Sequence, residues 1–296
     1  MSDESPLRIL QEASLQAHAV IRDEIAGLFE RYGETTPDVT PTLKQLFWYL
    51  SARNQAVTFL VSWGYSWDAE IILRSFYETA AKILFICFAE DEDKPGLMDE
   101  FWNKLGSIND RRRARKAEFS VQMKEEDDVS SSIFEALSDE RLFDLDAKGN
   151  KAERKRLEQK WSFSEIIEAL DGRVVGGKPL VGMKSVLHIY GVCSHLAHAD
   201  SAAMDLMADR ALRPKDELLL LEAGHISRIL SDQVSLTWFC AEALRRHFKG
   251  EFSDTEKFYA AFQKTAELSE PLQAAFNESQ REFYERILRK QQEVGA

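Results

Sequence analysis

Apolar residues recur along most of the chain at the three- and four-residue spacing of an amphipathic helix. The pattern predicts helices over residues 5–32, 40–64, 66–89, about 180–199 and about 214–248. Pro6, Pro41 and Pro214 stand near three of the predicted starts, where proline is tolerated. No alternation of strand type is sustained, and we expect a short extended piece only near 173–181 or 199–212. The pattern therefore predicts an all-α, multi-helix bundle.

The middle of the chain differs in character from its flanks. Residues 89–160 contain 19 acidic and 15 basic side chains in 72 positions, and their apolar residues are sparse. Such a composition is typical of an exposed, solvated segment. We therefore expect a bundle core from residues 1–90 and 160–250, a charged helical insertion over 91–159, and peripheral C-terminal helices over 251–296. We also expect a mobile stretch near 143–160, and a last helix that begins at Pro271.

Composition narrows the classes of protein that fit. The chain has 296 residues, is 44% hydrophobic and 30% charged, and carries a formal net charge of −12. This acidic balance disfavours long-range attraction to nucleic acid or to anionic membranes. Three scattered cysteines indicate reduced thiols. The N-terminus has no apolar signal core, and charged residues interrupt the most apolar stretch. We expect a cytoplasmic protein without a membrane segment.

One stripe of charged residues crosses that apolar stretch. Glu70, Arg74, Glu78 and Lys82 recur every four residues and so share one face of the predicted helix over 66–89. A solvated row of ion pairs accounts well for Glu70 and Lys82. It accounts less well for Arg74 and Glu78, which apolar residues flank on both sides. For these two, a solvated position and an inward position with polar partners both stay open.

A second stripe supplies candidate partners. Tyr190, Ser194 and His198 are four residues apart, on one face of the predicted helix over 180–199. Gly191 lies near this face, and we expect it to allow a neighbouring helix to approach closely. A hydroxyl or an imidazole must find a partner when it is buried. Arg74 and Glu78 are the natural partners.

These motifs carry a resemblance. The pattern R-S-x-x-E at Arg74 to Glu78, followed by W-S-x-x-x-I-I from Trp161 and Y-x-x-x-S-x-x-x-H from Tyr190 to His198, resembles a family of uncharacterised, all-helical, mostly bacterial proteins. The similarity covers about residues 45–245. It implies a helical bundle in which these polar residues converge, and it implies no known activity.

Two further features are weaker. Glu222 and His225 form an E-x-x-H pair, which with Glu78 and His198 could supply ligands for one metal ion, although E-x-x-H is common in helical proteins. We expect no cofactor. The basic run R-R-R-A-R-K at 111–116 is interpreted as a solvated helix face balanced by the acidic run at 125–128, in preference to a nucleic-acid contact.

Two classes of function follow from the polar residues. The first is a ligand-binding module in which Arg74, Glu78, Tyr190, Ser194 and His198 hold a small anionic ligand, with stress or phage defence as a hypothesis for its context. The second is a metal-independent ribonuclease. HEPN ribonucleases pair an arginine with a histidine four to six residues later, and none of the six histidines here follows an arginine at that spacing. A HEPN-like enzyme would need a distributed site, with Arg74 steadying phosphate charge, His198 transferring a proton and Glu78 orienting His198. The sequence also leaves open whether the chain forms a homo-oligomer.

Overall fold

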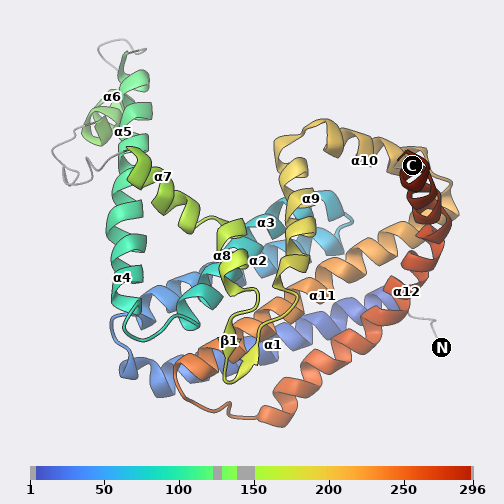
Figure 1. Ribbon diagram of the computed structural model, residues 1–296, viewed down its shortest axis with the longest axis horizontal. Helices are drawn as coiled ribbons and strands as arrows, with labels where there is room; N and C mark the ends of the chain where they lie inside the picture. The colour runs from blue at the N-terminus through green and yellow to red at the C-terminus, as the bar shows by residue number, and fades with distance from the viewer. Residues whose placement is uncertain (1–4, 123–128, 139–150, 295–296) are drawn as a thin grey trace.

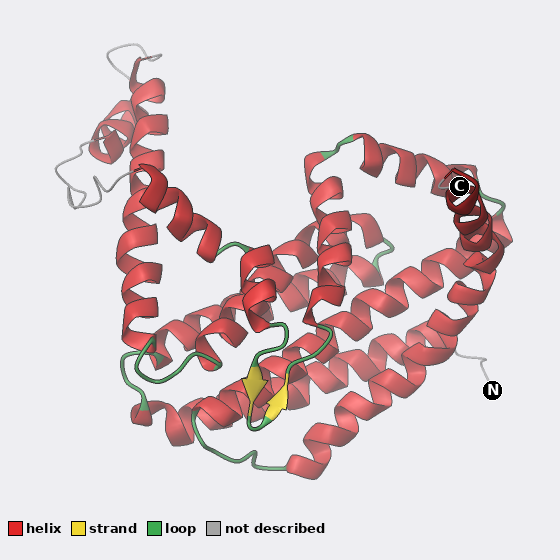
Figure 2. Cartoon of the chain, in the orientation of Figure 1, coloured by secondary structure: helices red, strands yellow, loops and turns green. Residues whose placement is uncertain are grey.

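The computed structural model describes residues 5–122, 129–138 and 151–294 (Figure 1). Within these residues nearly every element is a helix, and the one sheet is a two-stranded hairpin (Figure 2). The predicted all-α, multi-helix fold is confirmed. None of the described helices is both long enough and apolar enough to cross a lipid bilayer.

Five long helices make the body of the molecule. They are α1 (Pro6–Tyr32), α2 (Thr40–Ser62), α3 (Ser66–Cys87), α11 (Lys215–His247) and α12 (Thr255–Val294). Helix α3 lies against both α2 and α11, and α1 lies against α11 and α12 (Figure 1). Because α3 is covered on most sides, side chains all around it are buried, among them Leu73, Phe76 and Leu84. This position explains why its sequence is almost continuously apolar.

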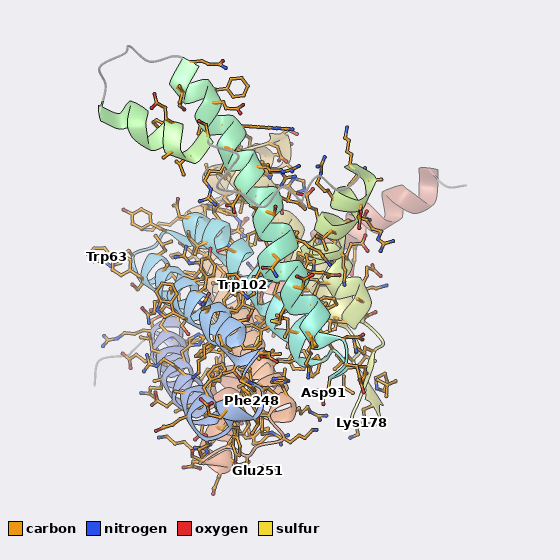
Figure 3. All side chains as sticks on the ribbon, turned by 90° about the vertical axis from the view of Figure 1, so that its left-hand side faces the viewer. Trp63, Asp91, Trp102, Lys178, Phe248 and Glu251 are labelled. Atoms are coloured by element: carbon orange, nitrogen blue, oxygen red, sulfur yellow. The ribbon has the colours of Figure 1, made fainter. Side chains whose placement is uncertain are left out.

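The charged middle of the chain projects from this body. It comprises α4 (Lys94–Asp99), a π-helical segment (Glu100–Lys104), α5 (Leu105–Gln122), α6 (Val129–Ser138) and α7 (Lys151–Lys160). Helix α4 still packs into the core through Leu97 and Met98, whereas α5 and α6 extend away from the long helices (Figure 1). At its base, Trp102 donates its indole N–H to Thr42 of α2 at 2.8 Å (Figure 3). Of the stretch predicted to be mobile, residues 143–150 lie outside the described residues and 151–160 form α7.

The chain then returns to the body through short elements. Helix α8 (Phe163–Leu170) begins at Ser162, whose hydroxyl accepts from the Glu165 amide at 3.5 Å as a helix cap does. Strands β1 (Val174–Val175) and β2 (Lys178–Pro179) pair antiparallel where an extended piece was predicted. A 3₁₀ turn leads into α9 (Val186–His198), and α10 (Ser201–Leu212) is helical where the alternative extended piece was considered.

The C-terminal segment differs from the prediction. We expected peripheral helices, the last of them beginning at Pro271, and the structure has the single helix α12 with Pro271 inside it. The first half of α12 belongs to the core, where Phe258 is completely buried. Asp254 caps its start by accepting from the Lys257 amide at 2.9 Å, and Glu24 of α1 holds the preceding loop by accepting from the amides of Ser253 at 2.6 Å and Asp254 at 3.0 Å. These contacts fix α12 against α1.

Candidate functional site

Arg74 is the centre of a polar cluster between α3 and α9. Its Nε donates to Glu78 Oε1 and to the Tyr190 hydroxyl, each at 3.3 Å. Its Nη1 lies 3.2 Å from Nε2 of His198. The structure thus brings together four of the five predicted site residues, and we call Arg74, Glu78, Tyr190 and His198 the Arg74 cluster.

Tyr190 is the most firmly positioned member of the cluster. Its hydroxyl donates to Glu78 Oε1 at 2.6 Å, and its ring stacks on Phe163 of α8 with centroids 4.1 Å apart. Burial raises the pKa of Tyr190, and the hydrogen bond to Glu78 raises it further. Tyr190 is therefore a neutral phenol that donates to the carboxylate, and it orients Glu78 and Arg74 together.

The cluster lies at the edge of the helix interface and is open to solvent. The side chains of Arg74 and Glu78 are 29% and 33% exposed, and His198 is exposed. Burial lowers the pKa of Arg74, but the hydrogen bonds and charges of Tyr190 and Glu78 outweigh it and the net direction is upward. We expected a buried polar pocket. The side chains meet as expected, but the cluster is half-exposed and not buried.

Two other residues of the α9 stripe act differently from the expectation. Ser194 donates its hydroxyl to the backbone carbonyl of Tyr190 at 2.9 Å, one turn earlier in the same helix, and is not part of the Arg74 cluster. At Gly191, a Cβ atom would meet nothing within 4 Å. The expected close approach of a helix at this glycine is wrong.

A second cluster, which the sequence did not predict, lies deeper at Glu70. Glu70 was expected in solvent, and it is completely buried. Its carboxylate is 2.6 Å from His225 Nε2, accepts from the Cys193 thiol at 3.0 Å, and pairs with Arg228 Nη2. The expectation fails because α9 and α11 both supply polar groups to this end of α3, and those groups offset the cost of burying a carboxylate.

This deeper cluster continues along α11. Arg228 Nη1 also pairs with Asp232 at 2.8 Å, and Asp232 accepts from the Tyr77 hydroxyl at 2.6 Å. Burial raises the pKa of Tyr77 well above its usual range, and it raises the pKa of Cys193 to about 12. Cys193 is therefore a protonated thiol and a poor nucleophile. The sequence signal that could have indicated this cluster was the four-residue spacing of Arg228 and Asp232.

The four candidate metal ligands are not brought together. Glu78 and His198 belong to the Arg74 cluster, whereas His225 pairs with Glu70. Burial and the nearby Arg210 lower the pKa of His225 to about 4, and Arg228 already balances the charge of Glu70. The described part of the chain contains no group of three or more His, Cys, Asp or Glu side chains placed to hold a metal ion.

The basic run on α5 is partly neutralised by neighbouring acids. Arg112 pairs with Glu158 of α7, and Arg113 pairs with Asp110. This pairing agrees with the interpretation of a solvated helix face. The acidic run at 125–128, which we expected to balance it, lies outside the described residues.

Comparison with known proteins places the chain in a family. The family model described as a family of unknown function (DUF5677) matches residues 45–212, which is more than half of the chain. The match contains every residue of the Arg74 cluster and ends before α11. No curated protein and no solved structure matches the chain. The chain therefore belongs to the DUF5677 family of unknown function.

Proposed function

We propose that the Arg74 cluster binds a small anionic ligand, with a phosphate or carboxylate group seated on Arg74 and His198. The observation that supports this most directly is the solvent-accessible arginine–histidine pair, whose nitrogens lie 3.2 Å apart. Two nitrogen-bearing side chains from different helices converge there, at the rim of the interface between α3 and α9. Convergent polar groups of this kind are typical of binding sites.

The guanidinium is oriented so that its terminal nitrogens remain for a ligand. Nε makes the contacts to Glu78 and Tyr190, and Nη1 contacts only His198. Nη2 has no hydrogen bond to any residue that the structure describes. A planar guanidinium with available terminal N–H groups suits the paired oxygens of a carboxylate or phosphate.

The position of the proton on His198 decides which of its two ring nitrogens can donate to a ligand. An arginine N–H can only donate, so a neutral His198 accepts at Nε2 and carries its proton on Nδ1. Nδ1 has no hydrogen bond to any residue that the structure describes, so its N–H is left to donate to an anion beside Arg74.

Binding of inorganic phosphate tests this proposal. Phosphate and acetate would be titrated into the full chain by calorimetry, comparing the wild type with Arg74→Gln. One lost charge-assisted hydrogen bond of about 1.5–3 kcal/mol predicts at least a tenfold loss of phosphate affinity. Arg213→Gln is the matched control, because Arg213 is 27% exposed and pairs with two carboxylates on α10 and α11.

The two variants separate a site from a general charge effect. We expect Arg213→Gln to bind phosphate as the wild type does. Equal affinity in all three proteins, or an equal loss in both variants, would contradict the proposal.

The alternative candidate is a metal-independent ribonuclease that uses the same pair. The specific observation in its favour is that Arg74 and His198 are adjacent and accessible, so one phosphodiester could contact both. His198 would transfer the proton as the 2′-hydroxyl attacks phosphorus and the 5′-oxygen leaves, and Arg74 would stabilise the added negative charge. Glu78 contacts Arg74 and Tyr190, so its suggested role in orienting His198 has no support among the described contacts.

Cleavage of RNA in the presence of a chelator distinguishes this alternative. A ribonuclease site at the Arg74 cluster requires that Arg74→Ala and His198→Ala each abolish cleavage, while the Arg213→Gln protein cleaves as the wild type does. Cleavage that persists unchanged in the first two variants would remove it. Phosphate binding without any cleavage would rule out the ribonuclease and support the proposal of anion binding.

A further inference from the structure

A cavity of about 360 Å³ lies between α1 and α2, with α11 at its floor. Its volume falls at the small end of the range found for ligand sites. The apolar part of its wall includes Leu15 of α1 and Phe47 and Phe59 of α2, and its floor includes Asn54 and Thr237. The Arg74 cluster contributes nothing to its lining, so the cavity is a separate feature of the molecule.

An amide network holds the floor of the cavity in place. Gln233 Nε2 donates to the backbone carbonyl of Asn54 at 3.1 Å and to its side-chain Oδ1 at 2.8 Å. Asn54 Nδ2 in turn donates to the Thr237 hydroxyl at 2.9 Å. These bonds tie α2 to α11 beneath the cavity, so the floor is preformed.

The same network determines the state of His18 in the cavity wall. The backbone carbonyl of Asn54 can only accept, which fixes Gln233 Nε2 as the donor and therefore Asn54 Nδ2 as the donor toward His18 Nδ1 at 3.4 Å. His18 then accepts at Nδ1 and keeps its proton on Nε2. Burial lowers the pKa of His18 to about 4, in agreement with a neutral ring. The inner wall therefore carries no charge.

One cation lies at the cavity and no anion lines it. Arg22 is the one side chain with a permanent charge among the residues that line the cavity, and these include no Asp or Glu. Helix α2 has no acidic residue over its whole length, in a chain whose net charge is −12. The Arg22 side chain is 53% exposed, and its Nη2 lies 3.6 Å from Oδ1 of the exposed Asp23, which is longer than a hydrogen bond. The surroundings therefore favour an anionic group at Arg22.

We propose that this cavity binds a small monocarboxylate with an apolar body. The carboxylate lies at Arg22, and the exposed polar side chain of Gln55 is another lining residue that can donate to it. The body covers Leu15 and Phe59, which are 54% and 62% exposed. The volume equals about twelve water molecules at ~30 Å³ each, which suits an acid on the order of ten non-hydrogen atoms.

The position of α2 adds to this proposal. Trp48 on this helix and Trp63 directly after it are also strongly exposed, and Trp63 lies at the outer edge of the molecule (Figure 3). The rings of Phe59 and Trp63 lie beside each other with centroids 6.0 Å apart, and exposed apolar groups that gather in this way often mark interaction sites. The cavity is the part of this surface with a defined shape and a cation, so it is the part that we assign to a ligand.

Decanoate and decanol are the probes that separate charge from apolar contact. Calorimetry on the full chain would compare the wild type with Arg22→Gln and with Arg8→Gln, an exposed arginine on the same helix that pairs with Glu12. We expect saturable decanoate binding that Arg22→Gln weakens at least tenfold and Arg8→Gln leaves unchanged. Decanol should bind the wild type and Arg22→Gln equally. Absence of saturable decanoate binding, or equal effects of the two variants, would overturn the proposal.

A cavity-filling variant locates the binding. Ala19 is half-buried in the wall, so Ala19→Phe should abolish binding of both probes while phosphate binding at the Arg74 cluster is retained. Wild-type decanoate affinity in this variant would overturn the assignment to the cavity. Circular dichroism would verify its fold, and if it fails to fold, the comparison of Arg22→Gln with Arg8→Gln still decides the question.

Discussion

At the scale of single residues, Glu70 and Glu78 show how position decides what a charge does. The two carboxylates lie two turns apart on one stripe of α3. Glu70 is completely buried and has partners from α9 and α11, whereas Glu78 is 33% exposed and pairs at the rim with Arg74 and Tyr190. A buried carboxylate needs every one of its partners, because the cost of an unpaired buried charge is several kcal/mol. Glu70 is therefore the residue of the stripe on which stability depends most.

Replacing Glu70 by Gln should lower the free energy of unfolding by about 2–4 kcal/mol. The neutral amide keeps the shape of the side chain but no longer balances the charge of Arg228, and it places an N–H group where a donor already points. Urea denaturation followed by circular dichroism would measure the change.

Glu12→Gln is the matched control for this prediction. Glu12 pairs with Arg8 on the surface, where both side chains are more than half exposed, and such pairs contribute at most about 1 kcal/mol. Equal stability losses in the two variants would mean that the Glu70 contacts add nothing beyond a surface ion pair.

At the scale of elements, two helical glycines distinguish a loosely covered helix from a tightly packed one. Gly191 of α9 faces open space, whereas a Cβ at Gly224 of α11 would lie 2.5 Å from Cβ of Phe276 in α12. Helix α9 leaves space at its glycine, whereas the close approach of α11 to α12 requires that Gly224 has no side chain. The same residue type therefore has opposite roles in the two helices.

Alanine at the two positions should change stability in opposite directions. Gly191→Ala should raise the free energy of unfolding by up to about 1 kcal/mol, because alanine favours the helix and meets no neighbour. Gly224→Ala should lower it by about 1–3 kcal/mol, because the clash with Phe276 outweighs the same gain. Chemical denaturation of both variants is the measurement. A loss of stability in Gly191→Ala would show that α9 is covered more closely than the structure indicates.

Helix starts could be predicted from local sequence, and the path of α12 could not. Ser162 and the prolines at positions 6 and 41 act through hydrogen bonds and dihedral angles within a few residues. The helix starts that they favour therefore do not depend on tertiary contacts. Pro271 carries a similarly local signal for a break. Packing of α12 against α1 and α11 overrides that signal and keeps one helix continuous through the proline.

At the scale of the whole molecule, two neutral histidines, the half-buried His18 and the buried His247, make stability depend on pH. His18 accepts from Asn54, and His247 Nδ1 accepts from the Lys94 ammonium at 2.9 Å, so both rings must be neutral. Burial lowers the pKa of each to about 4, against about 6.5 for an unfolded chain. Between these values the unfolded chain binds more protons than the folded one, so protonation favours unfolding.

The free energy of unfolding should therefore fall as the pH drops from 6.5 toward 4. The contribution of these two histidines to it should not change with pH above 7. Each histidine contributes at most about 1.4 kcal/mol per pH unit. Urea denaturation at several pH values would show a shallower dependence in His247→Gln than in the wild type. His188→Gln, at an exposed position of α9, serves as the control. An unchanged pH dependence in His247→Gln would mean that His247 is not held neutral.

Local sequence was enough to predict the helical class and the starts of most long helices, and it named Tyr190 and His198 as candidate partners for Arg74 and Glu78. These follow from periodicity and from the need of a polar group in an apolar stretch to find a partner. Only the tertiary structure decided how deeply each group lies, which placed Glu70 in the interior and left the Arg74 cluster open to solvent. It also decided that α1 and α2 leave a cavity at Arg22. Burial depends on which helices cover a face, and that choice is made by contacts between segments far apart in the chain.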